Sequence, residues 1–127
     1  MNRRRLTLKA LTEWERKPFE YGVADCCRFC GHVAKIITGK DHIAAFDYAN
    51  EDEANAIIKK HGDLGALVTS VLGEPSDDLL DGDPILIRLP GMPHPALAVK
   101  LGNEAIALGK SRFIHVSERY WSKGWAL

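Results

Sequence analysis

The sequence carries no net charge and no long apolar segment, and both absences restrict the functions open to it. Seventeen lysine and arginine residues balance seventeen aspartate and glutamate residues, so no overall field attracts nucleic acid or an anionic membrane surface. No segment approaches the roughly 20 consecutive apolar residues that a membrane-spanning helix needs. We therefore expect no nucleic-acid partner and no membrane span.

An export signal and a disulfide framework are also missing. The stretch Leu6–Leu11 is interrupted by Lys9, so it lacks the apolar core of about 7–15 residues found in secretory signals, and we expect no signal peptide. Cysteine is scarce, and Cys26, Cys27 and Cys30 all lie within five residues. An odd, clustered set indicates a reducing environment or an activated thiol rather than a disulfide framework.

The patterns that are present predict one α+β domain over residues 1–127, with N-terminal helices packed on a C-terminal antiparallel β-meander. Apolar residues at helical spacing fill the first half, whereas short apolar runs between turn residues fill the second half. Helices are predicted over Leu6–Trp14, Asp25–Gly39, Asn50–Gly62 and Asp63–Leu72. Strands are predicted over Ile85–Ile87, Ala96–Leu101, Glu104–Leu108 and Arg112–Val116, with Gly102-Asn103 as a tight turn.

The Asp25-Cys26 pair stands where the predicted central helix begins. Unpaired N–H groups and the helix dipole at that position stabilise a thiolate and lower the pKa of Cys26. Asp25 is the expected N-cap, although an ionised carboxylate beside the sulfur favours the neutral thiol. The alternative is that all three cysteines are small apolar core residues. The spacing alone leaves both interpretations open.

A cysteine hydrolase also needs a base, normally a histidine that the fold brings to the thiol. Of the five histidines, His94 is the best placed, because it lies just before the second predicted strand. His32 falls in the predicted central helix, and His42 and His61 fall near helix ends. His115 is predicted as a half-buried residue of the last strand.

Three short motifs follow one another in an order typical of one family. An aromatic-x-aromatic-Gly approach leads to Asp-Cys in Phe19–Phe29, Gly82-Asp83 precedes a strand, and Leu101-Gly102-Asn103 makes a hairpin. This order resembles the NlpC-like family of cell-wall cysteine peptidases, especially the small tail-associated members of bacteriophages and prophages. The resemblance covers most of the chain and implies a papain-like α+β core.

The resemblance also implies roles for particular residues. Cys26 falls on the nucleophile, which in the family attacks an amide in the peptide stem of peptidoglycan. Phe19 stands where many members have a tyrosine that helps to hold the oxyanion. Ala96 falls on the catalytic histidine, and Ala107 on the polar residue that orients its imidazole. Only His94, two residues before Ala96, remains as a candidate base.

Three functions stay open at this point. The first is a tail-tip or tail-assembly protein with a degenerate site, bound to other phage tail proteins in the virion tail or in the host cytoplasm during assembly. The second is an active hydrolase that uses Cys26 and His94 to open peptidoglycan locally during infection. The third is metal or dithiol chemistry at Cys27-x-x-Cys30 with His32 nearby, although no second cysteine or histidine pair completes four ligands. No cofactor is predicted.

Two further features have simple expectations. The run Arg3-Arg4-Arg5 is predicted to be a solvated terminus. Trp121 and Trp125 are expected either to anchor the core or to form part of an interface, since tryptophan is enriched in both places.

Overall fold

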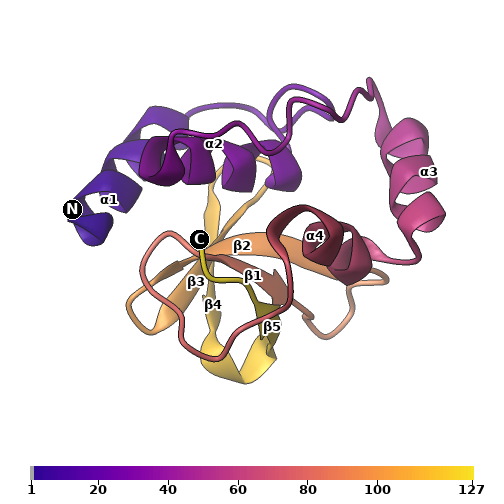
Figure 1. Cartoon of the computed structure of the whole chain (residues 1–127). Helices are drawn as coiled ribbons and strands as arrows, with labels where there is room; N and C mark the ends of the chain where they lie inside the picture. Colours follow the sequence, from indigo (N-terminus) through magenta and orange to yellow (C-terminus); the bar gives the residue numbers. More distant parts are fainter. Residues whose placement is uncertain (1) are drawn as a thin grey trace.

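The computed structural model describes residues 2–127 and is an α+β fold of four helices followed by a five-stranded antiparallel sheet. In Figure 1, α1 and α2 lie over the sheet and α3 stands at one side of the molecule. Among residues 2–127, no helix is long and apolar enough to cross a membrane. The helices are α1 (Arg3–Trp14), α2 (Cys26–Thr38), α3 (Glu51–His61) and α4 (Leu64–Leu72).

Every one of these four helices begins at a side-chain cap. The side chains of Asn2, Asp25, Asn50 and Asp63 each accept a hydrogen bond from the backbone N–H three residues further on. Such a cap stabilises a helix by about 1 kcal/mol. At its other end, α2 stops at Gly39, whose φ of 80° is readily adopted only by glycine. The predicted cap at Asp25 is confirmed, and the helices predicted from Asn50 and Asp63 begin directly after these residues.

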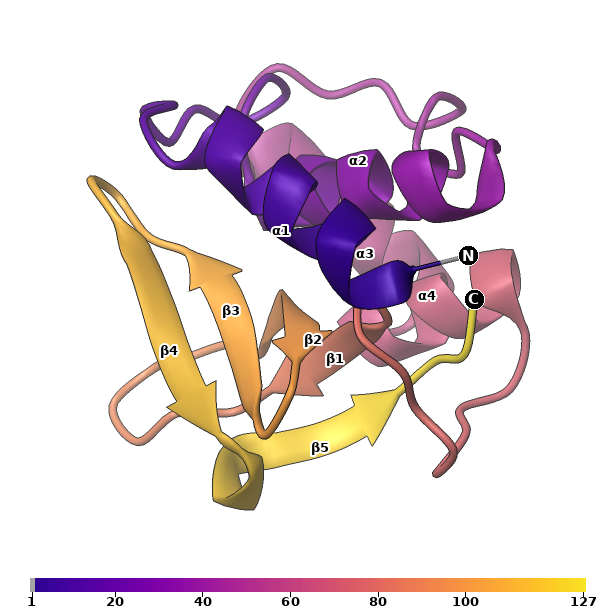
Figure 2. The ribbon, with the colours of Figure 1, turned by 90° about the vertical axis from the view of Figure 1, so that its left-hand side faces the viewer.

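The sheet has the strand order β4-β3-β2-β1-β5 and is antiparallel throughout. Four strands form the predicted meander, with the fourth beginning and ending one residue later than predicted. A short 3-10 helix, Glu118–Tyr120, then leads to a fifth strand that pairs with β1 at the opposite edge from β4 (Figure 2). The strands are β1 (Pro84–Ile87), β2 (Ala96–Leu101), β3 (Glu104–Leu108), β4 (Phe113–Ser117) and β5 (Trp121–Gly124).

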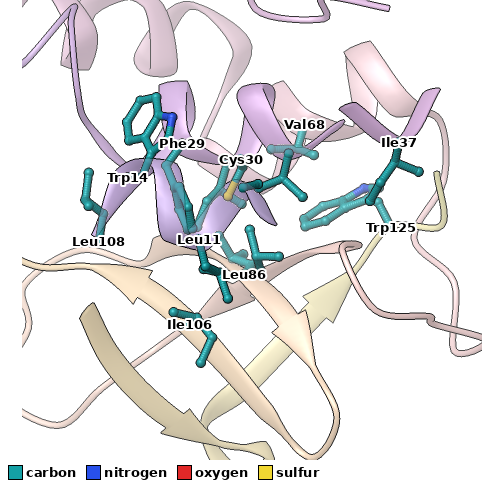
Figure 3. Close-up of a cluster of buried hydrophobic side chains, with 14 of the residues drawn as sticks. Leu11, Trp14, Phe29, Cys30, Ile37, Val68, Leu86, Ile106, Leu108 and Trp125 are labelled. Carbon is teal, nitrogen blue, oxygen red and sulfur yellow. The ribbon is translucent and has the colours of Figure 1, made fainter. Parts of the chain in front are cut away.

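The main apolar core lies between the helices and one face of the sheet (Figure 3). Phe29, Val33 and Ile37 place one face of α2 against it. Trp125 is fully buried there, and its indole N–H donates to the Thr69 hydroxyl at 3.1 Å. Trp125 is therefore a core anchor rather than an interface residue.

A second, smaller cluster covers the opposite face of the sheet. Its buried members are Ile85, Ile87, Ala98, Ala105, Ala107 and Val116. Trp121 is half-buried against this cluster, and its indole N–H donates to the carbonyl of Val116 at 3.3 Å. Because side chains alternate along each strand, this cluster is separated from α2 by the sheet itself.

The carboxylate of Asp83 ties the two ends of the chain to the sheet. It is 1% exposed and accepts hydrogen bonds from the Arg3 guanidinium and from the backbone N–H groups of Leu80 and Leu127. Arg3 also donates to the carbonyl of Asp81 at 2.8 Å. The prediction of a solvated arginine run is thus wrong for Arg3, because a buried carboxylate from a distant loop lies within its reach.

Candidate functional site

A cavity of about 340 Å³ opens at the start of α2, and it brings the predicted site residues together. Cys26 and His94 both line it. Its walls come from the loop before α2, the loop between α2 and α3, the helices α3 and α4, and the segment that enters β2. The remaining lining residues are Phe19, Tyr21, Asp25, Cys27, Ile43, Phe46, Tyr48, Glu51, Ala54, Asn55, Ile57, Ile58, Leu64, Leu67, Met92, Pro93, Pro95, Ala96 and Leu108.

Asp25 fixes the start of α2 and hence the place of the Cys26 thiol. Its side chain is 2% exposed and accepts three hydrogen bonds. The Gly22 N–H donates at 2.8 Å, the Arg28 N–H at 2.8 Å and the Tyr48 hydroxyl at 2.9 Å. Burial and the bond to Asp25 raise the pKa of Tyr48, so its hydroxyl keeps the proton that it donates.

Arg28 holds the loop between α2 and α3 over the cavity. Its guanidinium donates to the carbonyl of Ile43 at 3.3 Å and to that of Phe46 at 2.7 Å. The same guanidinium lies over the Tyr48 ring, 4.8 Å from the ring centroid, in cation–π geometry. These contacts place the side chains of Ile43, Phe46 and Tyr48 in the cavity wall.

Helix α3 forms a wall of the cavity at the margin of the main core, against which Ile57 and Ile58 also pack. None of its residues is fully buried, and its half-buried apolar residues Ala54, Ile57 and Ile58 all line the cavity. Figure 1 shows this helix standing apart from α1 and α2 at the edge of the molecule. The apolar face of α3 thus lies between the margin of the core and the cavity.

Cys26 is the activated thiol of the three. Its pKa is lowered, first by a hydrogen bond from the Cys27 thiol and further by the Leu97 N–H on β2, whereas burial and the Asp25 carboxylate oppose this change. The side chain is half-buried, and Cys26 is the first residue of α2, where the positive end of the helix dipole favours a thiolate. Cys26 therefore has the character of a nucleophile.

The other two cysteines are inert by the same criteria. The hydrogen bond to Cys26 and burial raise the pKa of Cys27, and burial raises that of Cys30. Cys30 is buried, and its thiol donates to the carbonyl of Ala98 at 3.5 Å. Both thiols line a second cavity of about 60 Å³ whose walls are otherwise almost entirely apolar.

Among the described residues, the fold brings no further metal ligand to Cys27 and Cys30. His32, the nearest histidine in sequence, makes a hydrogen bond with the Glu13 carboxylate at 2.9 Å. Within residues 2–127, no three side chains of histidine, cysteine, aspartate or glutamate gather in a way that could hold a metal ion.

His94 reaches the cavity without any group that orients it. It is exposed, lies between two prolines in the loop before β2, and shares no hydrogen bond with another described side chain or backbone group. The predicted half-buried position of His115 is wrong: its side chain is 60% exposed on the edge strand β4, 3.4 Å from Glu104. An edge strand leaves alternate side chains in solvent, which explains the difference.

The three positions at which the resemblance implies polar groups are all apolar in the structure. Phe19 packs edge-on against Tyr21, with ring centroids 5.0 Å apart, and lines the cavity together with Ala96. Ala107 is buried in the cluster on the sheet face away from α2. Neither Ala96 nor Ala107 can accept or donate a side-chain proton.

Besides Tyr48, three polar residues of the cavity were not predicted as site residues. Tyr21 lies beside Cys26, and burial, Glu51 and Cys26 raise the pKa of its phenol, so it is a hydrogen-bond donor at neutral pH. Glu51 and Asn55 line the cavity from α3. Together with Ala54 and Ile58, these two residues are spaced three or four positions apart, so they lie on one face of the helix. This spacing is the sequence signal that could have grouped them.

Removing the Cys27 thiol should make Cys26 less reactive at neutral pH. In Cys27→Ala the largest stabilising contact of the Cys26 thiolate is lost, so the pKa of Cys26 rises and less thiolate is present at pH 7, about tenfold less for each unit of rise. The rate of iodoacetamide labelling at Cys26, followed by mass spectrometry across pH, measures this. Cys30→Ala is the control and should leave the Cys26 midpoint unchanged. Equal midpoints in the wild type and Cys27→Ala would contradict the assignment.

Asp25→Asn should destabilise the fold although asparagine is a good helix cap. The substitution keeps one acceptor for Arg28 and Tyr48 but turns an amide N–H₂ toward the Gly22 N–H, and one such unsatisfied buried contact costs about 1–3 kcal/mol. Asp63→Asn is the matched control, because Asp63 is an exposed cap with a single partner in α4. Urea unfolding should show a loss for Asp25→Asn and almost none for Asp63→Asn; equal losses would show that capping alone accounts for Asp25.

Comparison with known proteins gives a family for nearly the whole chain. The family model described as Domain of unknown function (DUF6950) matches residues 2–127. A search of the curated proteins finds no match. The matched range contains the entire cavity lining, including Cys26 and His94. Since the family model covers all residues but the first, this chain belongs to the DUF6950 family.

Proposed function

We propose that this chain is a bacteriophage or prophage tail protein, acting in the tail tip or in tail assembly, with an NlpC-like cysteine-peptidase scaffold that no longer hydrolyses peptides. The order of its motifs, from Phe19–Phe29 to Leu101-Gly102-Asn103, resembles small tail-associated members of that family. Its partners are then other tail proteins, met in the virion tail or in the host cytoplasm during assembly.

One observation carries the loss of peptidase activity: the cavity holds an activated thiol without an oriented base. Hydrolysis of an amide needs a group that protonates the departing amine and then activates water. Ala96 and Ala107 occupy the positions implied for the histidine and its orienting partner. His94 reaches the cavity from an exposed loop, with no partner that fixes its tautomer or its ring.

The second candidate is an active peptidoglycan hydrolase that uses Cys26 as nucleophile and His94 as base. It is favoured by the lowered pKa of Cys26 and by the presence of both side chains in one cavity. Substrate can bring a loosely placed base into line, because catalytic hydrogen bonds often tighten only in the complex. The two functions therefore differ in what the protein does to peptidoglycan.

Purified protein should release no muropeptides from peptidoglycan above the level of a buffer blank. The wild type, Cys26→Ala and His94→Ala are compared with His115→Ala, which changes an exposed histidine outside the cavity. Under the proposed function all four give the same result. Release by the wild type and His115→Ala, with a loss of roughly a thousandfold or more in the other two, would establish the hydrolase instead.

The protein should be found with tail components. Virions or tail particles of the phage or prophage that encodes it are purified and analysed by mass spectrometry, and tagged protein is recovered from infected or induced cells under crosslinking. We expect peptides of this chain in the particles, or tail proteins among its crosslinked partners. Its absence from the particles, together with a lack of tail proteins among the partners, would overturn the assignment to the tail.

A further inference from the structure

The cavity beside Cys26 is built for an apolar occupant rather than for a peptidoglycan stem. Its walls are mainly aliphatic and aromatic, and they include Ala54, Ile57 and Ile58 of α3, which stay only half-buried although Ile57 and Ile58 also pack against the main core. Peptide stems are rich in carboxylates and amides, and burying these groups against aliphatic side chains costs free energy without hydrogen bonds in return. An aliphatic chain would instead complete the burial of α3.

The chemistry left to Cys26 points in the same direction. Amide hydrolysis needs a proton for the departing amine, and His94, the candidate base, has no hydrogen-bond partner that orients it for this step. Exchange between a thiolate and a thioester needs no proton transfer, because one thiolate attacks and another leaves, and its rate follows the thiolate fraction and the basicity of the leaving thiol. A thiol without a base is therefore still competent to accept an acyl group from a thioester.

We propose that Cys26 accepts a straight-chain acyl group from a small-molecule acyl thioester and holds it as an S-acyl adduct, with the chain lying in the cavity against α3. This inference rests on the proposed function in one respect, namely that the site does not hydrolyse amides. It adds a ligand class for the same cavity.

The step balances without any further reagent. The Cys26 sulfur forms a bond to the carbonyl carbon of the donor, and the carbon–sulfur bond of the donor breaks as its thiolate departs with the electron pair. The Arg28 N–H of α2 already donates to Asp25, so stabilisation of the negative charge on the carbonyl oxygen falls to the N–H of Cys26 itself. Because no base is oriented to activate water, the adduct persists.

The size of the cavity limits the length of the chain. A volume of about 340 Å³ lies at the small end of the roughly 300–1,000 Å³ found for small-molecule sites, so the cavity suits a medium-length chain such as an octanoyl group. A two-carbon acetyl group would leave most of the cavity empty. Octanoyl and acetyl donors therefore differ in the part of the ligand that the cavity recognises.

The test compares octanoyl- and acetyl-N-acetylcysteamine as donors to the full chain, with intact-mass and peptide mass spectrometry as readout. Each buried methylene favours transfer by roughly fourfold (~0.8 kcal/mol), so partial burial of six should make octanoyl transfer at least about 50-fold faster than acetyl transfer. The adduct should map to Cys26 and be absent in Cys26→Ala. Equal rates for the two donors, no adduct, or adducts on Cys27 or Cys30 would overturn the proposal.

A matched pair of variants on α3 tests whether the chain occupies the cavity. Ala54 lines the cavity, whereas Ala56 lies on the exposed side of the same helix. Ala54→Phe should lower the ratio of octanoyl to acetyl transfer at least about tenfold, and Ala56→Phe should leave both rates as in the wild type. A loss of both transfers only in Ala54→Phe, or no effect on octanoyl transfer, would count against the cavity. The chain-length ratio of the wild type tests the proposal even if a variant does not fold.

The muropeptide assay and the particle analysis separate this inference from the proposed function. A protein that releases muropeptides contradicts the proposed function whatever its acyl transfer rate. A protein that shows neither muropeptide release nor chain-length selectivity retains the proposed function and loses this inference.

Discussion

The carboxylate of Asp25 is the constraint on which the site depends. A buried carboxylate is stable only where hydrogen bonds replace the water it has lost. This one receives three, from the turn at Gly22, from the first turn of α2 and from Tyr48 in the following loop. Three segments therefore converge on one side chain. Cys26 is its neighbour in sequence, so the same hydrogen bonds hold the thiol at the mouth of the cavity.

The parts of the fold that could be predicted are those whose chemistry is local. Asp25, Asn50 and Asp63 act on N–H groups three residues away, so a short stretch of sequence contains the whole signal. The strand β5 depends instead on its distant partner β1, and its four residues show no alternation that marks them as a strand. Arg3 differs from expectation for the same reason, since Asp83 lies 80 positions away.

In the candidate site, too, the parts set by local sequence could be predicted and the parts set by distant contacts could not. The sequence predicted that Cys26 stands at the start of α2 and that His94 lies just before β2. The structure places both side chains in the lining of one cavity. The walls of the cavity could not be predicted. An apolar stripe such as that of α3 indicates that this helix face is buried, but it does not indicate which residues or which cavity the face packs against. The site combines a thiol of lowered pKa with a histidine that no hydrogen bond orients.

The bonds of Asp83 bear on the order in which the protein assembles. Arg3 and Leu127 meet at this one carboxylate, so the segments at both ends of the fold are joined through the loop before β1 (Figure 2). Contacts between residues so far apart in sequence form against a larger entropy of loop closure than helix caps or hairpins do. We expect the helices and the β1–β4 meander to form early, and the ends to close over them last.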